Sequence, residues 1–245
     1  MEKENKVEFK VSGRYALFTD PLTKIGGEKF SYQIPTYEAL KGIISSVYWK
    51  PTIIWVIDKV RVMKAIRTQT RSAKPIVYSG GNSLSIYTYL SDVEYQVQAH
   101  FEWNLHRKDL EKDRNENKHW CVARRMIERG GRRDVFLGTR ECQGYVEPCK
   151  FGEDQGFYNS YGELSFGLMF HGFDYPDEFG KNEFHSRLWQ VKMLDGVIKF
   201  PHPGEFPKPE KGLYLKFIRP MTAQLVQTNG LAEEGLLEGC EEVAQ

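Results

Sequence analysis

The sequence has no long hydrophobic run. None of its apolar stretches approaches the roughly 20 residues of a membrane-spanning helix, and the charged start M-E-K-E-N-K leads into no apolar signal-peptide core. Hydrophobic residues make up 40% of the 245 and charged residues 27%, which is typical of a globular chain long enough for a sizeable core. We therefore expect a soluble, cytoplasmic protein.

Cysteine is scarce, and no set of metal ligands is evident. The four cysteines are Cys121, Cys142, Cys149 and Cys240. Their spacing matches neither a disulfide framework nor a zinc ribbon, which fits a reducing compartment. His100 and His106 are six residues apart, an unusual ligand pair, and His119 beside Cys121 has no further partners in the sequence. We expect no metal and no cofactor.

Several nucleotide and hydrolase motifs are also missing. The sequence contains no Walker A loop, no dinucleotide fingerprint and no G-x-S-x-G elbow. The zinc-deaminase signature is absent too, because Pro148-Cys149 is followed by K-F-G. These absences argue against nucleotide hydrolysis, dinucleotide-dependent chemistry and zinc-dependent deamination.

Net charge is small, at +1, but its distribution is uneven. The segment from Lys112 to Arg133 holds eight Lys or Arg against three acidic residues, a local charge of +5, whereas the last fifteen residues hold five Glu and no Lys or Arg. Because binding of a polyanion responds to the local field, a basic block can bind one despite the low net charge.

The first part of the chain alternates between strand and helix patterns. Apolar alternation predicts a strand over 7–18, and β-branched residues predict another over 53–62. Between them, Thr36 is a candidate N-cap for a helix with apolar residues at helical spacing, which Pro51 ends.

A second strand–helix–strand pattern follows. Residues 65–85 are basic and rich in turn formers and read as a mobile insertion, and 93–103 alternate as a strand. A helix is predicted over 117–129, capped by Asn115 or Asn117 and ended by Gly130-Gly131, and a strand over 134–142.

The order β-α-β-β-α-β predicts an α+β protein whose N-terminal domain, residues 1–150, is ferredoxin-like, the plan of RNA-recognition domains. Residues 151–203 predict a small antiparallel β-sheet domain, with a hairpin turn at Asp195-Gly196. Residues 204–245 read as a proline-rich, linker-like segment and an acidic tail.

Lys118 and His119 stand side by side at the start of the second predicted helix. Helix N-termini favour phosphate, lysine supplies a point charge, and histidine can move a proton near neutral pH. The simpler interpretation is a solvated helix start with a surface lysine and histidine. Neighbouring helix positions do not face each other, so the two could only flank one substrate from two sides.

Tyr48 and a group of arginines are further candidates. Tyr48 closes the apolar face of the first helix, where a tyrosine is either a core aromatic or a hydroxyl available for proton transfer. The arginines after His119 outnumber the acids available to pair with them, and their planar guanidinium groups bind phosphate in a bidentate way. For any single one of them, an ordinary solvated surface position is the alternative. They are Arg124, Arg125, Arg129, Arg132 and Arg133.

Several long motifs together resemble one known family. They are F-T-D-P-L-T-K-I-G-G-E-K (18–29), P-T-Y-E-A-L-K-G-I (35–43), V-Y-W-K-P-T (47–52), N-L-H-R-K-D-L (104–110), D-R-N-E-N-K-H (113–119) and G-G-R-R-D-V-F-L-G-T-R-E-C-Q-G-Y-V (130–146). The chain resembles the CRISPR-associated Cas-five family, in its Dvulg or type I-C subtype. That family belongs to a superfamily of repeat-associated RNA-binding proteins with ferredoxin-like domains.

The resemblance implies an endoribonuclease that cuts precursor CRISPR RNA within the repeat, needs no metal and leaves a 2′,3′-cyclic phosphate. It implies three catalytic residues: the tyrosine of V-Y-W-K-P matches Tyr48, and the Lys and His of D-R-N-E-x-K-H match Lys118 and His119. A reaction that uses the RNA 2′-hydroxyl as nucleophile needs a base, an acid and a cation near the phosphorane, and these residue types supply them. Which of Tyr48 and His119 is the base stays open at this stage.

Most members of the wider family are non-catalytic and hold one end of the guide RNA. The alternative is therefore a structural subunit that holds the processed RNA end without cutting it. Either way, the resemblance implies CRISPR repeat RNA, mature crRNA and the large and backbone subunits of a type I-C interference complex as partners, and no membrane. A metal-dependent DNA nuclease would need a carboxylate cluster that the sequence does not suggest.

Overall fold

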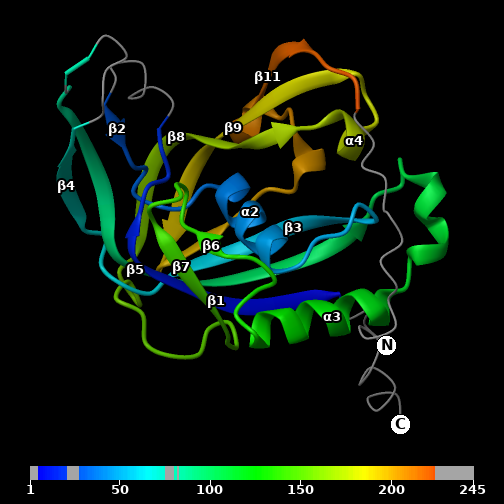
Figure 1. The fold of residues 1–245 in the computed structure, drawn as a ribbon, viewed down its shortest axis with the longest axis horizontal. Helices are drawn as coiled ribbons and strands as arrows, with labels where there is room; N and C mark the ends of the chain where they lie inside the picture. Colours follow the sequence, from blue (N-terminus) through cyan, green and yellow to red (C-terminus); the bar gives the residue numbers. More distant parts are fainter. Residues whose placement is uncertain (1–4, 21–27, 75–79, 82, 224–245) are drawn as a thin grey trace.

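The computed structural model describes residues 5–20, 28–74, 80–81 and 83–223. Its strands form one 11-stranded, mostly antiparallel sheet, and its helices are few, so the predicted α+β class is confirmed. Figure 1 shows the sheet curving around helix α2 (Tyr37–Val47), with helix α3 (Glu116–Glu128) along its lower edge.

Four strands form the centre of the sheet in the order β3-β5-β1-β7. Strand β1 (Lys6–Ala16) pairs antiparallel with β5 (Ser85–Trp103) and with β7 (Gln143–Pro148), and β3 (Ile53–Val62) pairs antiparallel with β5. The strands predicted over 7–18, 53–62 and 93–103 are therefore confirmed.

Both predicted helices form, and their caps match the sequence signals. The Thr36 side chain accepts a hydrogen bond from the backbone N–H of Ala39 and starts α2. The Asn115 side chain accepts from the N–H of Lys118 and starts α3, which ends before Gly130 and Gly131 at positive φ. Each N-cap places the first residue of its helix within a residue or two of its predicted position.

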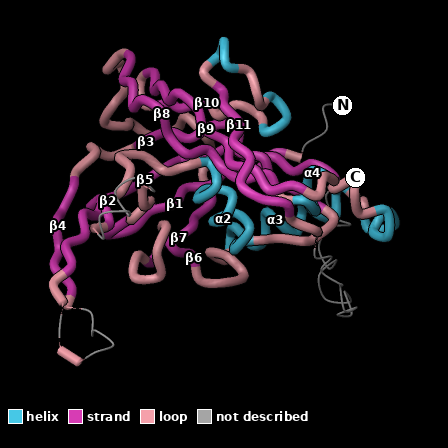
Figure 2. Tube along the Cα trace, turned by 90° about the horizontal axis from the view of Figure 1, so that it is seen from above, coloured by secondary structure: helices cyan, strands magenta, loops and turns pink. Residues whose placement is uncertain are grey.

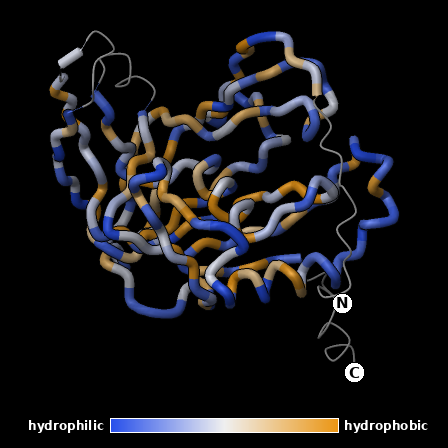
Figure 3. Tube along the Cα trace, in the orientation of Figure 1, coloured by the Kyte–Doolittle hydropathy of each residue, from blue (hydrophilic) through white to orange (hydrophobic). Residues whose placement is uncertain are grey.

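The two helices cover the same side of the central strands (Figure 2), and the core lies between. The apolar face of α2 (Leu40, Ile44) and that of α3 (Val122, Ala123) are buried together with Phe9 from β1. Hydrophobic residues concentrate where these elements meet (Figure 3). The core therefore holds the C-terminal end of α2 and the N-terminal turns of α3 against a common sheet.

Residues after 150 extend the same sheet. Strands β8 (Glu163–Asp174) and β9 (Glu183–Leu194) pair as a long hairpin, and the short helix α4 (Pro176–Phe179) lies in the connection between them. Strand β10 (Val197–Lys199) pairs with both β9 and β3. Asp195 and Gly196 turn between β9 and β10 with φ of 49° and 82°. The predicted hairpin at these two residues is confirmed.

The prediction of a mobile insertion over 65–85 is wrong for part of that segment. Strand β4 (Thr68–Ala73) pairs along the first third of β5, which begins at Ser85 rather than near residue 93, and the two-residue strand β2 (Lys29–Phe30) pairs there too. The polar side chains of β4 are mostly exposed, so the strand carries no apolar alternation and only its pairing with β5 reveals it. Residues 75–79 and 82 lie outside the described part.

The strand predicted over 134–142 is also wrong. Only β6 (Val135–Phe136) forms there, and the chain then turns into β7. Gly138 has a φ of 96° beside the backbone of Leu17, where a Cβ would overlap the Leu17 carbonyl group. The apolar run therefore bends at this glycine, and the fourth central strand is β7.

The linker-like prediction for the start of the 204–245 segment is corrected as well. The 3-10 helices η2 (Pro203–Glu205) and η3 (Pro209–Lys211) lead into β11 (Leu213–Pro220), which pairs with β9. The acidic tail itself lies outside the described residues. Within the described ranges, no helix is long and apolar enough to cross a membrane.

Candidate active site

Two segments about seventy residues apart in the sequence meet through Tyr48 and His119. Tyr48 caps the C-terminal end of α2 in an extended conformation, and its backbone N–H donates to the Ile44 carbonyl. His119 lies on the buried face of α3, one turn after the N-cap. The Tyr48 hydroxyl oxygen is 2.7 Å from Nδ1 of His119, and the two residues are only 3% and 0% exposed.

The second ring nitrogen of His119 defines the tautomer of the neutral ring. Nε2 lies 2.8 Å from the backbone carbonyl oxygen of Asp113. A carbonyl oxygen can only accept, so Nε2 carries the proton and Nδ1 has the lone pair. The Tyr48 hydroxyl therefore donates its hydrogen bond to His119.

The side chain of Asp113 joins the remaining polar groups. Asp113 is the last residue of the 3-10 helix η1 (Lys108–Asp113), just before α3. Its Oδ1 accepts from Nζ of Lys118 at 2.7 Å, and its Oδ2 accepts from the Thr52 hydroxyl at 2.5 Å. One carboxylate thus contacts both the lysine of α3 and the residue that precedes β3.

The charges of the site alter two pKa values. Burial lowers the pKa of His119 from its ordinary value of 6.5, with smaller contributions from Lys118 and Lys50, although Asp113 opposes the shift. Burial also acts to raise the pKa of Asp113, but hydrogen bonds from Lys118 and Thr52 outweigh it, so this pKa is lowered. At neutral pH the site therefore holds a neutral imidazole beside an ionised carboxylate.

Aromatic side chains enclose the imidazole. The rings of Trp103 and Phe101, at the end of β5, lie edge-on to His119 with centroids 5.5 and 6.0 Å away. The indole N–H of Trp55 on β3 donates to the Tyr48 carbonyl at 2.7 Å and fixes the backbone there. The aromatic side chains around the imidazole account for the desolvation of His119. Together with the Trp55 hydrogen bond, they orient Tyr48 and His119.

The structure brings the three predicted residues into one cluster, although Lys118 and His119 point in different directions. His119 points into the core, whereas the Lys118 side chain stays 13% exposed and turns back to Asp113. The solvated-helix-start interpretation of His119 is therefore wrong, since its ring is buried. The catalytic roles of Tyr48, Lys118 and His119 stay predictions.

Sequence reasoning missed Asp113 and Thr52. Both lie inside motifs that carry the family resemblance, D-R-N-E-N-K-H and V-Y-W-K-P-T. An aspartate just before a helix reads as an ordinary capping residue, and a threonine after a proline as the start of a strand. The signal available was that each lies within five residues of a predicted site residue.

The predicted arginines are spread over more than one surface. Arg124 is exposed and lies over the Trp120 ring at 4.7 Å, 4.0 Å from Glu128, while Arg125 is partly buried. Arg132 and Arg133 lie beyond the end of α3, where their backbone N–H groups donate to the carbonyls at the end of α2.

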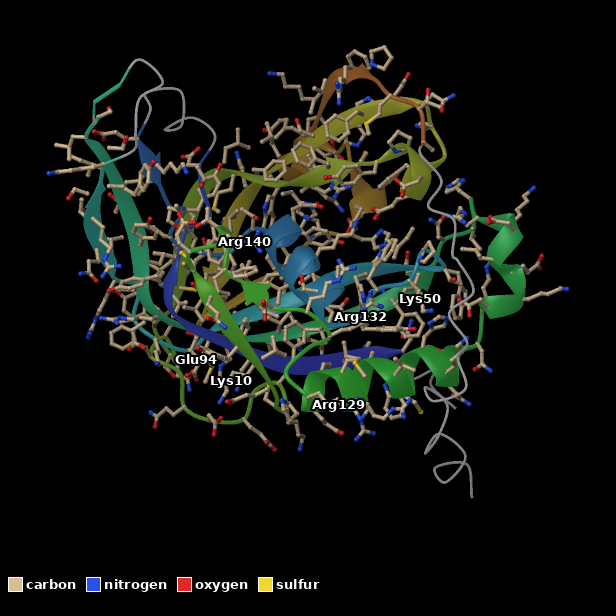
Figure 4. The ribbon with its side chains drawn as sticks, in the orientation of Figure 1. Lys10, Lys50, Glu94, Arg129, Arg132 and Arg140 are labelled. Atoms are coloured by element: carbon tan, nitrogen blue, oxygen red, sulfur yellow. The ribbon has the colours of Figure 1, made fainter. Side chains whose placement is uncertain are left out.

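The backbone N–H groups of Arg132 and Arg133 donate to the carbonyls of Val47 and Ser46, respectively. The basic turn at 132–133 therefore lies next to Val47, the residue that precedes Tyr48. Arg129, Arg132 and Arg133 also line one groove with the residues of β7. Figure 4 shows Arg129 at the end of α3 and Arg132 between α3 and α2. RNA binding by all five arginines stays a prediction.

Within the described residues, no group of three or more His, Cys, Asp or Glu side chains is placed to hold a metal ion. The site's polar side-chain groups are a phenol, an imidazole, an ammonium group, a threonine hydroxyl and one carboxylate. The candidate site is therefore a buried tyrosine–histidine hydrogen bond next to a lysine, on an α+β scaffold with a mostly antiparallel sheet.

Comparison with known proteins gives the family. The Cas5d family model, described as a CRISPR-associated protein (Cas5), matches residues 7–201. A relative from Mannheimia succiniciproducens named CRISPR pre-crRNA endoribonuclease Cas5d is 44% identical over 229 residues, covering 80% of this chain and 95% of the relative. One of the same name from Thermus thermophilus is 28% identical over 176 residues, covering 67% and 74%.

Solved structures agree. A crystal structure of a CRISPR-associated protein is similar with a TM-score of 0.66 and 37% identity, covering 82% of this chain and 93% of that one. A functionally uncharacterized protein from Streptococcus mutans has a TM-score of 0.66 and 38% identity, covering 83% and 95%.

Fold and family match together define a CRISPR-associated protein. More narrowly, the chain belongs to the Cas5d family, and the Cas-five resemblance read from its motifs is confirmed.

Proposed function

We propose that this chain is a metal-independent endoribonuclease that cleaves precursor CRISPR RNA within the repeat. The observation that carries the proposal is the buried Tyr48–His119 hydrogen bond, linked through Asp113 to Lys118. The 44% identical relative that bears the name pre-crRNA endoribonuclease supports the same activity. Together they favour catalysis over a purely structural role.

The direction of the hydrogen bond suggests how the base works. The RNA 2′-hydroxyl gives its proton to the Tyr48 oxygen while the Tyr48 proton passes to Nδ1 of His119, so the two residues act as one base. The neutral imidazole that burial favours is the form that can accept this proton. The 2′ oxygen then attacks the neighbouring phosphorus.

Lys118 supplies the positive charge. Its ammonium group faces the negative charge that develops on the phosphorane, where a fixed cation stabilises the transition state more than the ground state. The bond from phosphorus to the 5′ oxygen breaks, and that oxygen takes a proton from water. The products are a 2′,3′-cyclic phosphate and a 5′-hydroxyl, and no metal ion is needed for the charge balance.

The basic turn formed by Arg132 and Arg133 offers a path for the RNA backbone. Arg132 and Arg133 follow α3 and lie against the end of α2, so phosphates bound there would be adjacent to Tyr48. Because Tyr48 is only 3% exposed, neighbouring groups have to move before the RNA 2′-hydroxyl can reach its oxygen.

The strand order supports a finer description of the fold. The units β1, α2, β3, β5, α3 and β7, with the order β3-β5-β1-β7, follow the ferredoxin-like plan of RNA-recognition domains. We divide the chain into that unit over residues 1–150, an antiparallel β-region over 151–203 and a C-terminal segment over 204–245. β10 joins the first two in one sheet.

The protein is proposed to keep its product. After cleavage it would hold the mature crRNA and join the large and backbone subunits of a type I-C interference complex in the cytoplasm. Retention predicts one round of cutting per protein molecule, with the product released more slowly than it forms. Multiple turnover at excess substrate would contradict this part of the proposal.

Cleavage of a repeat hairpin RNA in EDTA tests the activity. We expect full cutting without added metal, and none when the scissile nucleotide lacks its 2′-hydroxyl. Lys118→Ala and His119→Ala should abolish cutting while RNA binding remains. Loss of activity in EDTA, or undiminished cutting of the 2′-deoxy substrate, would refute the mechanism, and tight binding with no cutting would select the structural-subunit alternative.

A further inference from the structure

We propose that Asp113 is a positioning residue of this site, holding Lys118 and the Tyr48–His119 pair in one arrangement without contacting RNA itself. The inference rests on the proposed function and adds to it a residue that neither the motif match nor the residue chemistry singled out. Asp113 is joined to both halves of the site by separate contacts.

The carboxylate joins segments that are distant in sequence. Oδ1 binds Lys118 on α3, and Oδ2 binds Thr52, four residues after Tyr48. Thr52 is 1% exposed and begins the approach to β3, so the contact ties the segment after Tyr48 to the start of the helix that carries His119. The link therefore helps to hold together the two segments that carry the tyrosine–histidine bond.

The backbone of the same residue orients the imidazole. Its carbonyl accepts from Nε2 of His119, which keeps Nδ1 free of a proton and directed at the Tyr48 hydroxyl. The carbonyl can stay in place only if the peptide does not rotate, and the two side-chain bonds of Asp113 oppose that rotation. Side chain and carbonyl therefore act together on the tautomer that the proton transfer requires.

The charge of Asp113 adds an electrostatic effect. Among the described residues, the charged and titratable groups that act on His119 include Asp113, Lys118, Lys50 and Tyr48, and Asp113 is the acid of these four. Its carboxylate raises the pKa of the imidazole against the two lysines. Removing the negative charge should lower that pKa further and make His119 a weaker proton acceptor.

A purely structural role for Asp113 predicts a different outcome. If the carboxylate only stabilised the fold, its loss would lower activity at every pH by the same factor, in step with thermal stability. If it positions and tunes the site, its loss must also move the acid limb of the pH–rate profile. Affinity for RNA should not weaken, because a negative charge next to the proposed phosphate site is removed.

The test is single-turnover cleavage of a repeat hairpin RNA by the full chain across the histidine titration range. For Asp113→Asn we expect a rate lower by about 10- to 100-fold at neutral pH, an acid limb shifted to lower pH, and an unchanged or tighter Kd. Asp113→Glu, which keeps the charge, should restore the position of the acid limb. An unshifted limb in Asp113→Asn, or a Kd that weakens in parallel with the rate, would overturn the proposal.

Two further variants keep the test decisive. Asp109→Asn is the matched control, because Asp109 lies on the same 3-10 helix and pairs with Arg107 at 2.7 Å, so its rate should stay near wild type. Thr52→Val removes one of the carboxylate's hydrogen bonds and leaves its charge. It should lower the rate several-fold without moving the limb, and if Asp113→Asn does not fold, a wild-type rate for Thr52→Val overturns the proposal.

The proposed catalytic site and the positioning role of Asp113 can be contradicted separately. Full activity of Lys118→Ala and His119→Ala would contradict the proposed site. Loss of activity in those variants, with Asp113→Asn indistinguishable from wild type in rate and pH profile, would contradict only the role of Asp113.

Discussion

At the scale of single residues, the decisive feature is the burial of His119. A histidine next to a lysine at a helix start is ordinarily solvated, yet this ring is fully buried among Trp103, Phe101 and Tyr48. Burial of both ring nitrogens is tolerated because each has a hydrogen-bond partner. The same burial lowers its pKa and keeps the imidazole neutral at neutral pH.

The pH dependence of cleavage follows from this shift. The base must be unprotonated, so the rate should fall as pH drops through the pKa of His119. Because that pKa is lowered from 6.5, the acid limb should lie below 6.5 and activity should be level around neutral pH. Single-turnover rates measured from acidic to neutral pH check this, and a limb above 6.5 would show that His119 is not the acceptor.

Tyr48→Phe isolates the hydroxyl. The substitution keeps the aromatic ring in the core and removes only the group that donates to His119. We expect cleavage to fall at least about 100-fold, with RNA affinity unchanged. The unpaired Nδ1 should also lower the free energy of unfolding by about 1–3 kcal/mol.

Cleavage assays and chemical denaturation measure the two effects of Tyr48→Phe. Tyr161→Phe is the matched control, because Tyr161 is an exposed tyrosine just before β8 and should change neither quantity. A Tyr48→Phe protein that cuts at the wild-type rate would remove the hydroxyl from the mechanism.

At the scale of elements, a buried polar network docks the β8–β9 hairpin onto α2. Arg187 on β9 is only 1% exposed. It donates to Asp174 on β8 and, at 3.2 Å, to Nδ1 of His171, and its guanidinium group lies 4.0 Å from the carboxylate of Glu38 on α2. The His171 ring stacks on Tyr37 with centroids 4.1 Å apart. The hairpin thus packs on the helix whose far end carries Tyr48.

Removing the arginine should be costly. Arg187→Met leaves the carboxylates of Asp174 and Glu38 without their buried cation, and such a change typically costs about 3–5 kcal/mol. We expect the free energy of unfolding to drop by that order, measured by denaturant titration. Lys192→Met on the same strand removes an exposed ion pair with Glu163 and should cost less than about 1 kcal/mol. Equal effects of the two variants would contradict the docking role.

At the scale of the whole molecule, charge is segregated although the net charge is +1. The arginines near the end of α3 form a basic region beside the site, whereas the last fifteen residues of the sequence carry five Glu and no Lys or Arg. Local field rather than net charge should therefore govern association with RNA.

RNA affinity should accordingly fall steeply with added salt. Each phosphate that an arginine neutralises contributes about 0.7 to the slope of log K against log salt concentration for a single strand. Arg132→Ala and Arg133→Ala should each lower this slope, and Arg124→Ala and Arg125→Ala should weaken binding more than turnover. Binding titrations at several salt concentrations test this, and a flat dependence in the wild-type protein would argue against all five assignments.

Much of the architecture was predictable from local signals. The caps at Thr36 and Asn115, the apolar periodicity of α2 and α3 and the turn at Asp195-Gly196 are short-range features, so the chain specifies them wherever they lie. The wrong predictions concern segments whose structure depends on pairing or contact with a distant part of the chain rather than on their own apolar periodicity. Strand β4 is polar and visible only through its partner β5, and the bend at Gly138 depends on the approach of Leu17.

The sequence by itself determined the family, the helices with their caps and the identity of Tyr48, Lys118 and His119 as candidates, because long motifs and helix signals are local. Only the tertiary structure decided that Tyr48 donates to a buried His119, that Asp113 and Thr52 join the site, and that the arginines divide between surfaces. The contacts of Tyr48 with His119 and of Thr52 with Asp113 join groups more than sixty residues apart, and only the packing of the helices on the sheet brings them together.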